Sequence, residues 1–318
     1  MTISTIRIGI LDYPGVMRSA LHGLEEMFLL ANDVSAQSAS DLRFAVSVYE
    51  MSALSPAAGN KGDKLQVILV PPSIARDYGL LPNALLRRWI LDHHAQGTII
   101  CSACAGAFIL ADAGLLHERQ ATTHWKLAPE FARAFPDVLL QTDKILINDG
   151  DVITAAGIMS WVDLGLEIVA QFMGAKVMRQ LGKNLVVDTG LREQRYYETF
   201  SPRLDHGDPA VLKAQHYVQK NFMKPVATAE LSALSHLTGR TFLRRFTKAT
   251  GLKPRQYIQR LRIQKACDLI EQTNATVDTI ALKVGYEDSS AFRRMFARTV
   301  GLSPRDFRAR FGHKQVAG

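Results

Sequence analysis

The sequence predicts a chain in two parts of different fold class, a doubly wound α/β domain followed by an all-α domain. Three observations lead to this prediction. Strand-like and helix-like segments alternate over about the first 190 residues, the later segments have helical periodicity, and one stretch of the later part occurs twice. The length of 318 residues is enough for two or three domains.

The α/β part is predicted from short apolar runs that alternate with segments of helical periodicity. The run 66–72 is apolar throughout, which is typical of a strand covered on both faces of a sheet. The turn 148–151 joins two apolar runs and predicts a hairpin. The predicted strands are 7–11, 44–50, 66–72, 98–103 and 138–141, and the predicted helices are 19–32, 83–94, 161–173 and 176–187.

Composition sets the expected domain boundaries. Residues 189–207 are polar and without clear periodicity, so we interpret them as a linker between an α/β domain at 1–188 and a helical domain at 208–312, with a tail at 313–318. Residues 208–318 hold 20 Lys and Arg against 8 Asp and Glu, whereas the rest of the chain holds 18 against 22. This asymmetry indicates an anionic polymer, nucleic acid before a membrane surface, as the partner of the helical domain.

The helical part contains an internal repeat. Residues 241–258 (TFLRRFTKATGLKPRQYI) return as residues 291–308 (AFRRMFARTVGLSPRDFR), with identical residues at seven of 18 positions. About one identity is expected by chance at typical residue frequencies. Two copies are too few for a solenoid, so the repeat predicts a duplicated small module.

Each copy predicts a helix-turn-helix unit, at about 228–248 and 277–298. In the second helix of each unit, two phenylalanines four residues apart face a core and several arginines face outward. A basic second helix of this kind fits the major groove of DNA, where arginine pairs with guanine. The amphipathic segment 254–270 is expected to hold the two units apart.

The sequence also argues against a membrane-spanning, a secreted and a metal-binding protein. No run approaches the roughly 18 apolar residues of a membrane span, and the first residues lack the pattern of a signal peptide. The three cysteines have no metal-like or disulfide-like spacing, so we expect a cytoplasmic protein with no metal and no cofactor. Cys101 and Cys104 form a CxxC pattern, but Cys101 lies in a predicted strand and is interpreted as a buried apolar residue.

Residues 209–311 resemble the DNA-binding domain of the AraC/XylS-type transcription regulators, most closely over DTIALKVGYEDSSAFRRMFARTVGLSPRDFR (278–308). The resemblance implies seven helices with two recognition helices. His236 stands where the first turn of the family usually has glycine, which predicts a differently bent turn. Leu243 can contact only a thymine methyl group. The implied base-contacting residues are Arg240, Leu243 and Arg244, then Ser290, Arg293 and Arg294, and we add Arg245 as an outward-facing cation.

A second motif, TIICSACAGAF (98–108), places Cys104 between an apolar strand and a helix. Such a turn is how an α/β enzyme presents a nucleophile. With ATTHW (121–125), the motif is similar to the amidase-like or PfpI-like domains of the glutamine-amidotransferase superfamily. Regulators that join such a domain to an AraC-type tail form the GlxA-like group, and this resemblance covers essentially the whole chain. It implies a flavodoxin-like or amidotransferase-like fold, and it makes Cys104 and His124 the counterparts of the catalytic pair in enzymatic relatives.

Three interpretations of Cys104 stay open: a nucleophile, a member of a ligand pocket, or a packing residue in a strained turn. The alignment places Ala20, which has no carboxylate, about where the enzymes carry their acid. Glu25 and Glu26 follow later and are assigned to the outer face of that helix. His124 is either part of the same pocket or structural.

We therefore expect a sequence-specific DNA-binding transcription regulator, an activator, controlled by a small polar metabolite in a catalytically inactive amidase-like domain. The alternative is a cysteine hydrolase or amidase with an appended nucleic-acid-binding domain. Expected partners are promoter DNA, RNA polymerase and a second copy of the chain, with 161–173 as candidate dimer interface. The metabolite is expected to carry a carboxylate or amide, as amino acids and betaines do, because backbone N–H groups at an elbow bind such groups. The expected ligand-binding residues are Cys104, Ala105, His124, Trp125, Gly157 and Ile158.

Overall fold

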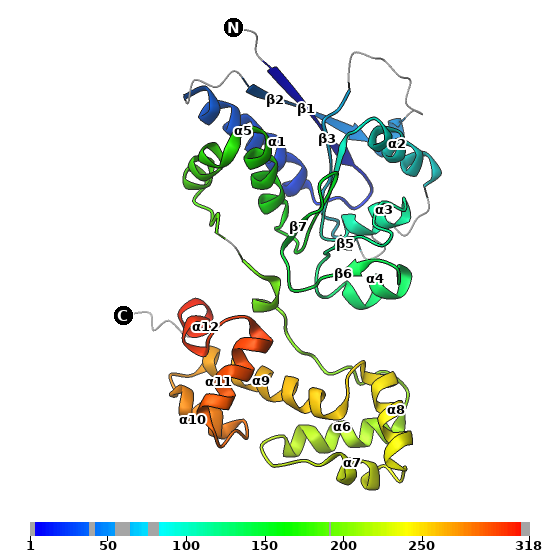
Figure 1. Ribbon diagram of the computed structural model, residues 1–318, viewed down its shortest axis with the longest axis vertical. Coiled ribbons are helices and arrows are strands. Elements are labelled where there is room, and N and C mark those ends of the chain that lie inside the picture. The colour runs from blue at the N-terminus through cyan, green and yellow to red at the C-terminus, as the bar shows by residue number, and fades with distance from the viewer. Residues whose placement is uncertain (1–3, 38–41, 55–63, 76–82, 191, 313–318) are drawn as a thin grey trace. The chain divides into compact units, whose positions relative to one another are not determined.

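The computed structural model divides the chain into two compact units, Met1–Gln194 and Arg195–Gly318, termed here the α/β unit and the helical unit. The boundary lies inside the segment 189–207 that was expected to be a linker. The residues described are 4–37, 42–54, 64–75, 83–190 and 192–312 (Figure 1).

The α/β unit is built on a six-stranded sheet of order β2-β1-β3-β4-β8-β7, in which only β7 runs antiparallel to its neighbour. The predicted hairpin is confirmed, because β7 and β8 pair across the turn at 148–151. The predicted strand at 138–141 lies instead in a separate parallel pair of β5 and β6. The strands are β1 (Ser4–Asp12), β2 (Leu42–Glu50), β3 (Val67–Val70), β4 (Ile99–Ala103), β5 (Gln120–Ala121), β6 (Leu139–Leu140), β7 (Leu146–Asn148) and β8 (Val152–Ala155).

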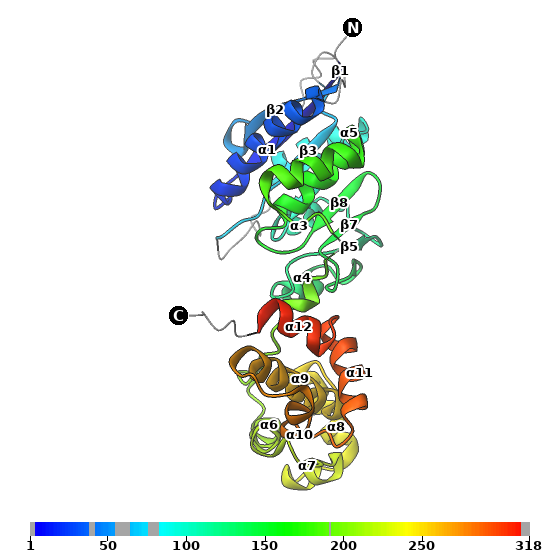
Figure 2. The same cartoon turned by 90° about the vertical axis from the view of Figure 1, so that its left-hand side faces the viewer.

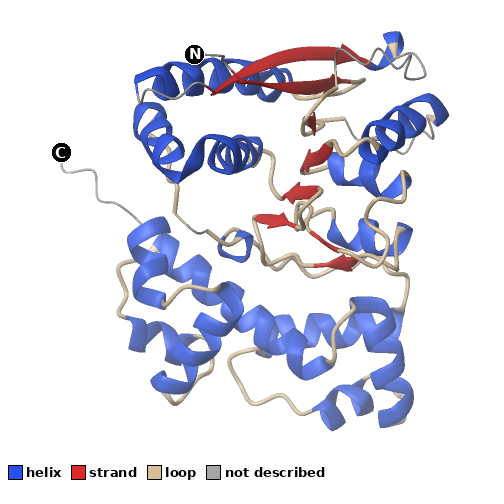
Figure 3. Cartoon of the chain, turned by 45° about the horizontal axis from the view of Figure 1, so that its top comes forward, coloured by secondary structure: helices blue, strands red, loops and turns tan. Residues whose placement is uncertain are grey.

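Helices cover both faces of this sheet (Figure 3). Helices α1 and α5 lie side by side on one face (Figure 2), and α2 and α3 contact β4 from the other. The predicted break between two helices at 161–187 is a kink in α5 at Gly174, whose φ is 85°. The helices are α1 (Arg18–Gln37), α2 (Ala84–Ala95), α3 (Gly106–Asp112), α4 (Ala128–Ala134) and α5 (Trp161–Leu185), with 3-10 turns η1 (Met51–Ala53) and η2 (Gln194–Tyr196).

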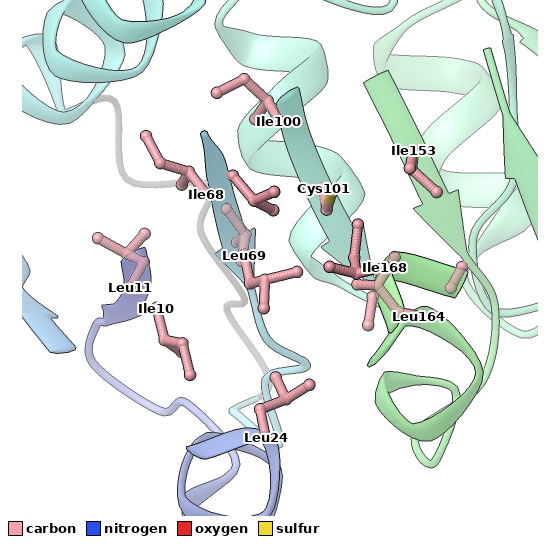
Figure 4. Packing of buried hydrophobic residues seen from close by; sticks show 14 of the residues in the cluster. Ile10, Leu11, Leu24, Ile68, Leu69, Ile100, Cys101, Ile153, Leu164 and Ile168 are labelled. Atoms are coloured by element: carbon pink, nitrogen blue, oxygen red, sulfur yellow. The ribbon is translucent and has the colours of Figure 1, made fainter. Parts of the chain in front are cut away.

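The central strands are buried on both sides, as their continuous apolar runs predict. Each residue of β3 is buried, and β3 pairs in parallel with β4 through Ile68↔Ile100 and Leu69↔Cys101. Figure 4 shows Cys101 among these side chains, close to Ile168 of α5. Cys101 is fully buried, and burial raises the pKa of its thiol. The prediction that Cys101 is an apolar core residue is confirmed.

The helical unit consists, in its described part, of seven helices arranged around the long helix α9. The first half of α9 packs in one core with α6 to α8, and its second half packs in another with α10 to α12. The repeated phenylalanines, Phe242 and Phe246 in one core and Phe292 and Phe296 in the other, are fully buried. The helices are α6 (Pro209–Asn221), α7 (Thr228–Leu234), α8 (Gly239–Thr250), α9 (Pro254–Gln272), α10 (Val277–Lys283), α11 (Ser289–Val300) and α12 (Pro304–Phe311).

The two helix-turn-helix turns close with the same hydrogen bond. The N–H of Leu237 donates to the Ser232 carbonyl over 3.0 Å, and the N–H of Tyr286 donates to the Ala281 carbonyl over 2.9 Å. This is the Schellman closure of a helix, which requires a left-handed residue just before the donor. The expectation of a differently bent first turn is wrong in this respect, because His236 takes the left-handed φ, 54°, that a glycine normally supplies.

Candidate functional site

Cys104 forms a strained turn between β4 and α3. Its φ of 54° lies in the left-handed region, which residues other than glycine rarely adopt. Its N–H donates to the Ala155 carbonyl over 2.7 Å. Gly106 lets α3 approach β3 closely, because a Cβ there would lie 2.8 Å from the Val70 carbonyl oxygen. The strand-to-helix turn expected from the sequence is therefore formed, with Cys104 only 5% exposed.

The Cys104 thiol is held in its neutral form. Burial raises the pKa of the thiol to about 11, although the N–H groups of Ala105 and Gly157 donate to the sulfur and oppose this shift. A cysteine nucleophile needs the thiolate. The structure thus brings three of the expected ligand-binding residues together around a sulfur that is protonated at neutral pH.

His124 lies near this turn but does not pair with the thiol. Its Nδ1 accepts a hydrogen bond from the Lys126 N–H over 3.0 Å, and its ring lies 5.5 Å from that of Trp125. Burial, followed by the charge of Lys126, lowers the pKa of His124. Within the described residues, no hydrogen bond joins His124 to Cys104. Ile158, the remaining residue of the expected set, is 42% exposed.

Tyr13 is a residue of this site that the sequence analysis missed. It follows β1 directly, is 5% exposed, and donates its hydroxyl to the Pro71 carbonyl over 2.6 Å. Burial raises the pKa of Tyr13, and Cys104 adds to the shift, so the phenol lies within electrostatic range of the thiol. The carboxyl ends of parallel strands meet at one edge of a sheet. The position of Tyr13 directly after a predicted strand could therefore have indicated that it lies at the same edge of the sheet as Cys104.

Gln194 is the second residue missed, and it ties the turn to the end of the α/β unit. Its Oε1 accepts from the Trp125 N–H over 2.9 Å, and its Nε2 donates to the Thr123 carbonyl over 3.0 Å. Thr123 in turn donates its hydroxyl to the Cys104 carbonyl over 2.7 Å. Gln194 is only 3% exposed, yet its partners lie 69 to 71 positions away, so no local pattern marks it.

The residues that follow Gln194 are anchored within the helical unit. Glu198 pairs with Arg260 of α9 over 2.8 Å, and the Phe200 N–H donates to Gln264 of α9 over 2.8 Å. Arg310 of α12 donates to the Tyr197 hydroxyl over 3.0 Å. The expected linker is therefore held by hydrogen bonds on both sides of the unit boundary.

Helices α8 and α11 present the residues expected to contact DNA. Thr238 and Asp288 cap these helices, accepting from the N–H groups of Thr241 and Ser290 respectively. Leu243 is 41% exposed, although it is apolar. Six of the residues expected to contact DNA have exposed side chains: Arg240, Leu243, Arg244, Ser290, Arg293 and Arg294.

Arg245 differs from the other expected DNA contacts. Its guanidinium donates to both carboxylate oxygens of Asp208, over 2.8 and 2.7 Å, and its side chain is 36% exposed. Asp208 also caps α6 by accepting from the Val211 N–H. Arg245 therefore connects α8 to the start of α6, because its side chain turns toward the body of the unit instead of outward.

The arginines of α11 have acidic neighbours. Arg293 donates to Asp278 of α10 over 2.8 Å, and Ser289 donates to the same carboxylate. Arg294 lies 3.9 Å from Asp288. On α8, within the described residues, Arg240 and Arg244 have no ion-pair or hydrogen-bond partner.

Comparison with known proteins agrees with these two units. Residues 63–171 match the DJ-1/PfpI family and residues 231–310 match a helix-turn-helix domain. The HTH-type transcriptional regulator CdhR of Pseudomonas aeruginosa is 27% identical over 226 residues, which is 70% of this chain and 67% of CdhR. The HTH-type transcriptional regulator ArgR of the same organism is 28% identical over 240 residues, 75% of this chain and 70% of ArgR.

The solved structures similar to the chain include an AraC family transcriptional regulator from Pseudomonas putida. It is 18% identical, with a TM-score of 0.48, and the match covers 57% of this chain and 99% of that one. None of the described helices is both long enough and apolar enough to cross a membrane. Both relatives are named transcriptional regulators and the chain matches a helix-turn-helix domain, which supports a regulator that is not an enzyme. The chain is a DNA-binding transcription regulator that joins an N-terminal DJ-1/PfpI domain to an AraC-type helix-turn-helix domain.

Proposed function

We propose that the protein is a cytoplasmic, homodimeric transcription activator whose occupancy of a promoter, and contact with RNA polymerase, change when a small metabolite binds beside Cys104. The metabolite carries a carboxylate or amide, as an amino acid or a betaine does. Binding favours one of two arrangements of the chain and thereby shifts their populations. The observation that carries this proposal is the hydrogen-bonded path from the Cys104 turn through Gln194 to the boundary of the units.

The chemistry of the turn supports an anionic or polar ligand group. The N–H groups of Ala105 and Gly157 both point at the Cys104 sulfur, and backbone donors of this kind bind oxyanions. The neutral thiol adds no negative charge that would oppose a carboxylate. The Trp125 ring beside His124 supplies an apolar wall for the body of the ligand.

The contacts of Gln194 suggest how the site acts on DNA binding. A ligand that displaces Trp125 or Thr123 changes the two hydrogen bonds that hold the Gln194 side chain. Residues Tyr197, Glu198 and Phe200 are held to α9 and α12 by hydrogen bonds. Only a few residues therefore separate the hydrogen bonds of Gln194 from those of the helical unit. A change at the turn is therefore passed on through the backbone at Gln194 and Arg195.

Isothermal titration of the full chain with glycine betaine, carnitine and arginine tests the ligand site. We expect one compound to bind, and Cys104→Ala and Trp125→Ala each to weaken it at least tenfold. Glu26→Gln, at an exposed position of α1, is the matched control and keeps the wild-type affinity. Unchanged affinity in both site variants would show that the turn is not the binding site.

Insertion of two glycines between Gln194 and Arg195 tests the path to DNA. DNA from upstream of the protein's own gene serves as the probe in a fluorescence-polarisation assay. The insertion is expected to leave metabolite affinity unchanged and to abolish the effect of the metabolite on DNA affinity. Two glycines inserted after the exposed Gly150, in the hairpin turn, form the control and keep that effect. An insertion at 194/195 that preserved the effect would exclude this path.

A further inference from the structure

The α/β unit contains a cavity of about 480 Å³ that is distinct from the Cys104 turn. It lies along the edge strand β7 and helix α5, and residues 188–190, 192 and 193 form part of its wall. None of the six residues expected to bind ligand lines it. Its volume falls in the range of small-molecule sites, roughly 300–1,000 Å³.

The lining of this cavity combines apolar side chains with an excess of acidic ones. Leu146, Leu166 and Met178 supply apolar surface from β7 and α5. The charged side chains are four carboxylates and two cations: Asp163, Glu167, Asp188 and Glu193 against Lys144 and Arg192. Apolar side chains together with an excess of carboxylates suit an alkyl chain that carries positive charge.

The carboxylates differ in how far they are already neutralised. Asp163 forms an ion pair with Arg192 over 2.5 Å, and its side chain is 19% exposed. Glu167 accepts from the neutral amide of Asn148 over 2.7 Å, and Asp188 accepts from the N–H of Gly190 over 2.8 Å. Within the described residues, neither Glu167 nor Asp188 has a cation within ion-pair distance, so both retain charge for a ligand.

We propose that this cavity is a second effector site, which binds a small organic dication such as a diamine or an alkylguanidine. Glu167 and Asp188 hold its two charged groups, and its alkyl chain packs against the apolar side chains of the lining. Asp188 belongs to the segment that leads directly to Gln194, so an occupant of the cavity also contacts the path to the helical unit. The site takes a cation without a carboxylate, whereas the Cys104 turn takes an anionic or amide group.

Agmatine, which carries a guanidinium and an ammonium on a four-carbon chain, is the probe for isothermal titration of the full chain. We expect saturable binding, with Glu167→Gln and Asp188→Asn each weakening it at least tenfold and the double variant abolishing it. Glu167→Gln keeps an acceptor for Asn148, so its tryptophan fluorescence is expected to match the wild type. The uncharged analogue 1,4-butanediol is expected not to bind.

The variant Cys104→Ala distinguishes this cavity from the site beside Cys104 in the proposed function. The assignment of the cavity does not depend on that function. Agmatine affinity is expected to be unchanged in Cys104→Ala and in the surface control Glu26→Gln. Failure of agmatine to bind, or binding unaffected by Glu167→Gln and Asp188→Asn, would overturn the assignment. If Cys104→Ala lost agmatine binding while Glu167→Gln and Asp188→Asn kept it, agmatine would bind at the Cys104 turn, and the assignment to the cavity would also be overturned.

Discussion

The two helix-turn-helix units share a scaffold and differ in what that scaffold presents. The rings of Phe242 and Phe246 lie 5.4 Å apart in one unit, and those of Phe292 and Phe296 lie 5.7 Å apart in the other. The helices that follow the turns, α8 and α11, are both 12 residues long and both end at a left-handed glycine. Duplication has therefore preserved the core and the helix ends.

The turns show the first difference. Between the left-handed residue and the capping residue of the next helix there is one residue in the first unit, Leu237, and two in the second, Tyr286 and Glu287. The first turn is exposed at His236. The second turn packs closely, since a Cβ at Gly285 would lie 2.4 Å from the Met223 carbonyl oxygen.

The arginines show the second difference. Arg240 and Arg244 of α8 are exposed without an acidic partner in the described chain, whereas Arg293 of α11 is paired with Asp278. An ion pair must be broken before such an arginine contacts a base, and that loss reduces the gain from binding. The comparison indicates that the two units contribute unequally to DNA recognition although their sequences repeat.

The largest expected effect tests the shared scaffold. Phe246→Ala and Phe296→Ala should each lower the free energy of unfolding of the helical unit by about 3–5 kcal/mol, because each removes a fully buried ring. All three tryptophans, Trp89, Trp125 and Trp161, lie in the α/β unit. The urea concentration at the midpoint of unfolding should therefore stay unchanged when it is measured by tryptophan fluorescence. Far-UV circular dichroism, which reports on both units, should show an additional transition at lower urea concentration. Unequal losses in the two variants would show that the cores are not equivalent.

The next effect separates the turns. Gly285→Ala should cost about 2–4 kcal/mol, because it combines a left-handed backbone with overlap against Met223. His236→Gly is the matched change in the first unit and should alter the free energy of unfolding by no more than about 1 kcal/mol. Urea titration by circular dichroism measures both. A Gly285→Ala protein as stable as the wild type would contradict the packing described for the second turn.

DNA affinity separates the arginines. Arg244→Ala should cost about 1–3 kcal/mol on specific DNA, and Arg293→Ala less, because Arg293 first leaves its ion pair. Asp278→Asn should raise DNA affinity by releasing Arg293. Polarisation assays on specific and unrelated DNA at one salt concentration measure all three. Equal losses for Arg244→Ala on both DNAs would make it a phosphate contact.

The smallest effect concerns Arg245, whose counterpart in the second unit is Met295. The hydrogen bonds from Arg245 lower the pKa of Asp208 in the folded protein. The pair therefore stabilises the fold fully at pH values above the pKa of an unfolded aspartate, about 3.9. This stabilisation is lost as the pH falls through the lower pKa that Asp208 has in the folded protein. Arg245→Met should lower the unfolding temperature slightly at pH 7 and by less at pH 2. Lys248→Met, an exposed cation on the same helix, is the control and should lower it at neither pH.

Much of this architecture was accessible from local sequence. Apolar runs located the central strands, the repeat located both helix-turn-helix units, and a small-residue stretch after a strand located the Cys104 turn. Pairings between strands that are far apart in the sequence could not be predicted from local patterns. The position of residues 138–141 in a separate two-stranded sheet depends on pairing with β5, and no periodicity within those residues encodes it.

The sequence by itself determined the two fold classes, the duplicated module and the basic faces of α8 and α11, because periodicity, capping residues and charge act over a few positions. Only the tertiary structure decided how these parts are used. It buried the Cys104 thiol and kept it neutral, placed Tyr13 near it, turned Arg245 onto Asp208 and joined Gln194 to Trp125. These outcomes depend on burial and on partners tens of residues away, which folding alone brings together.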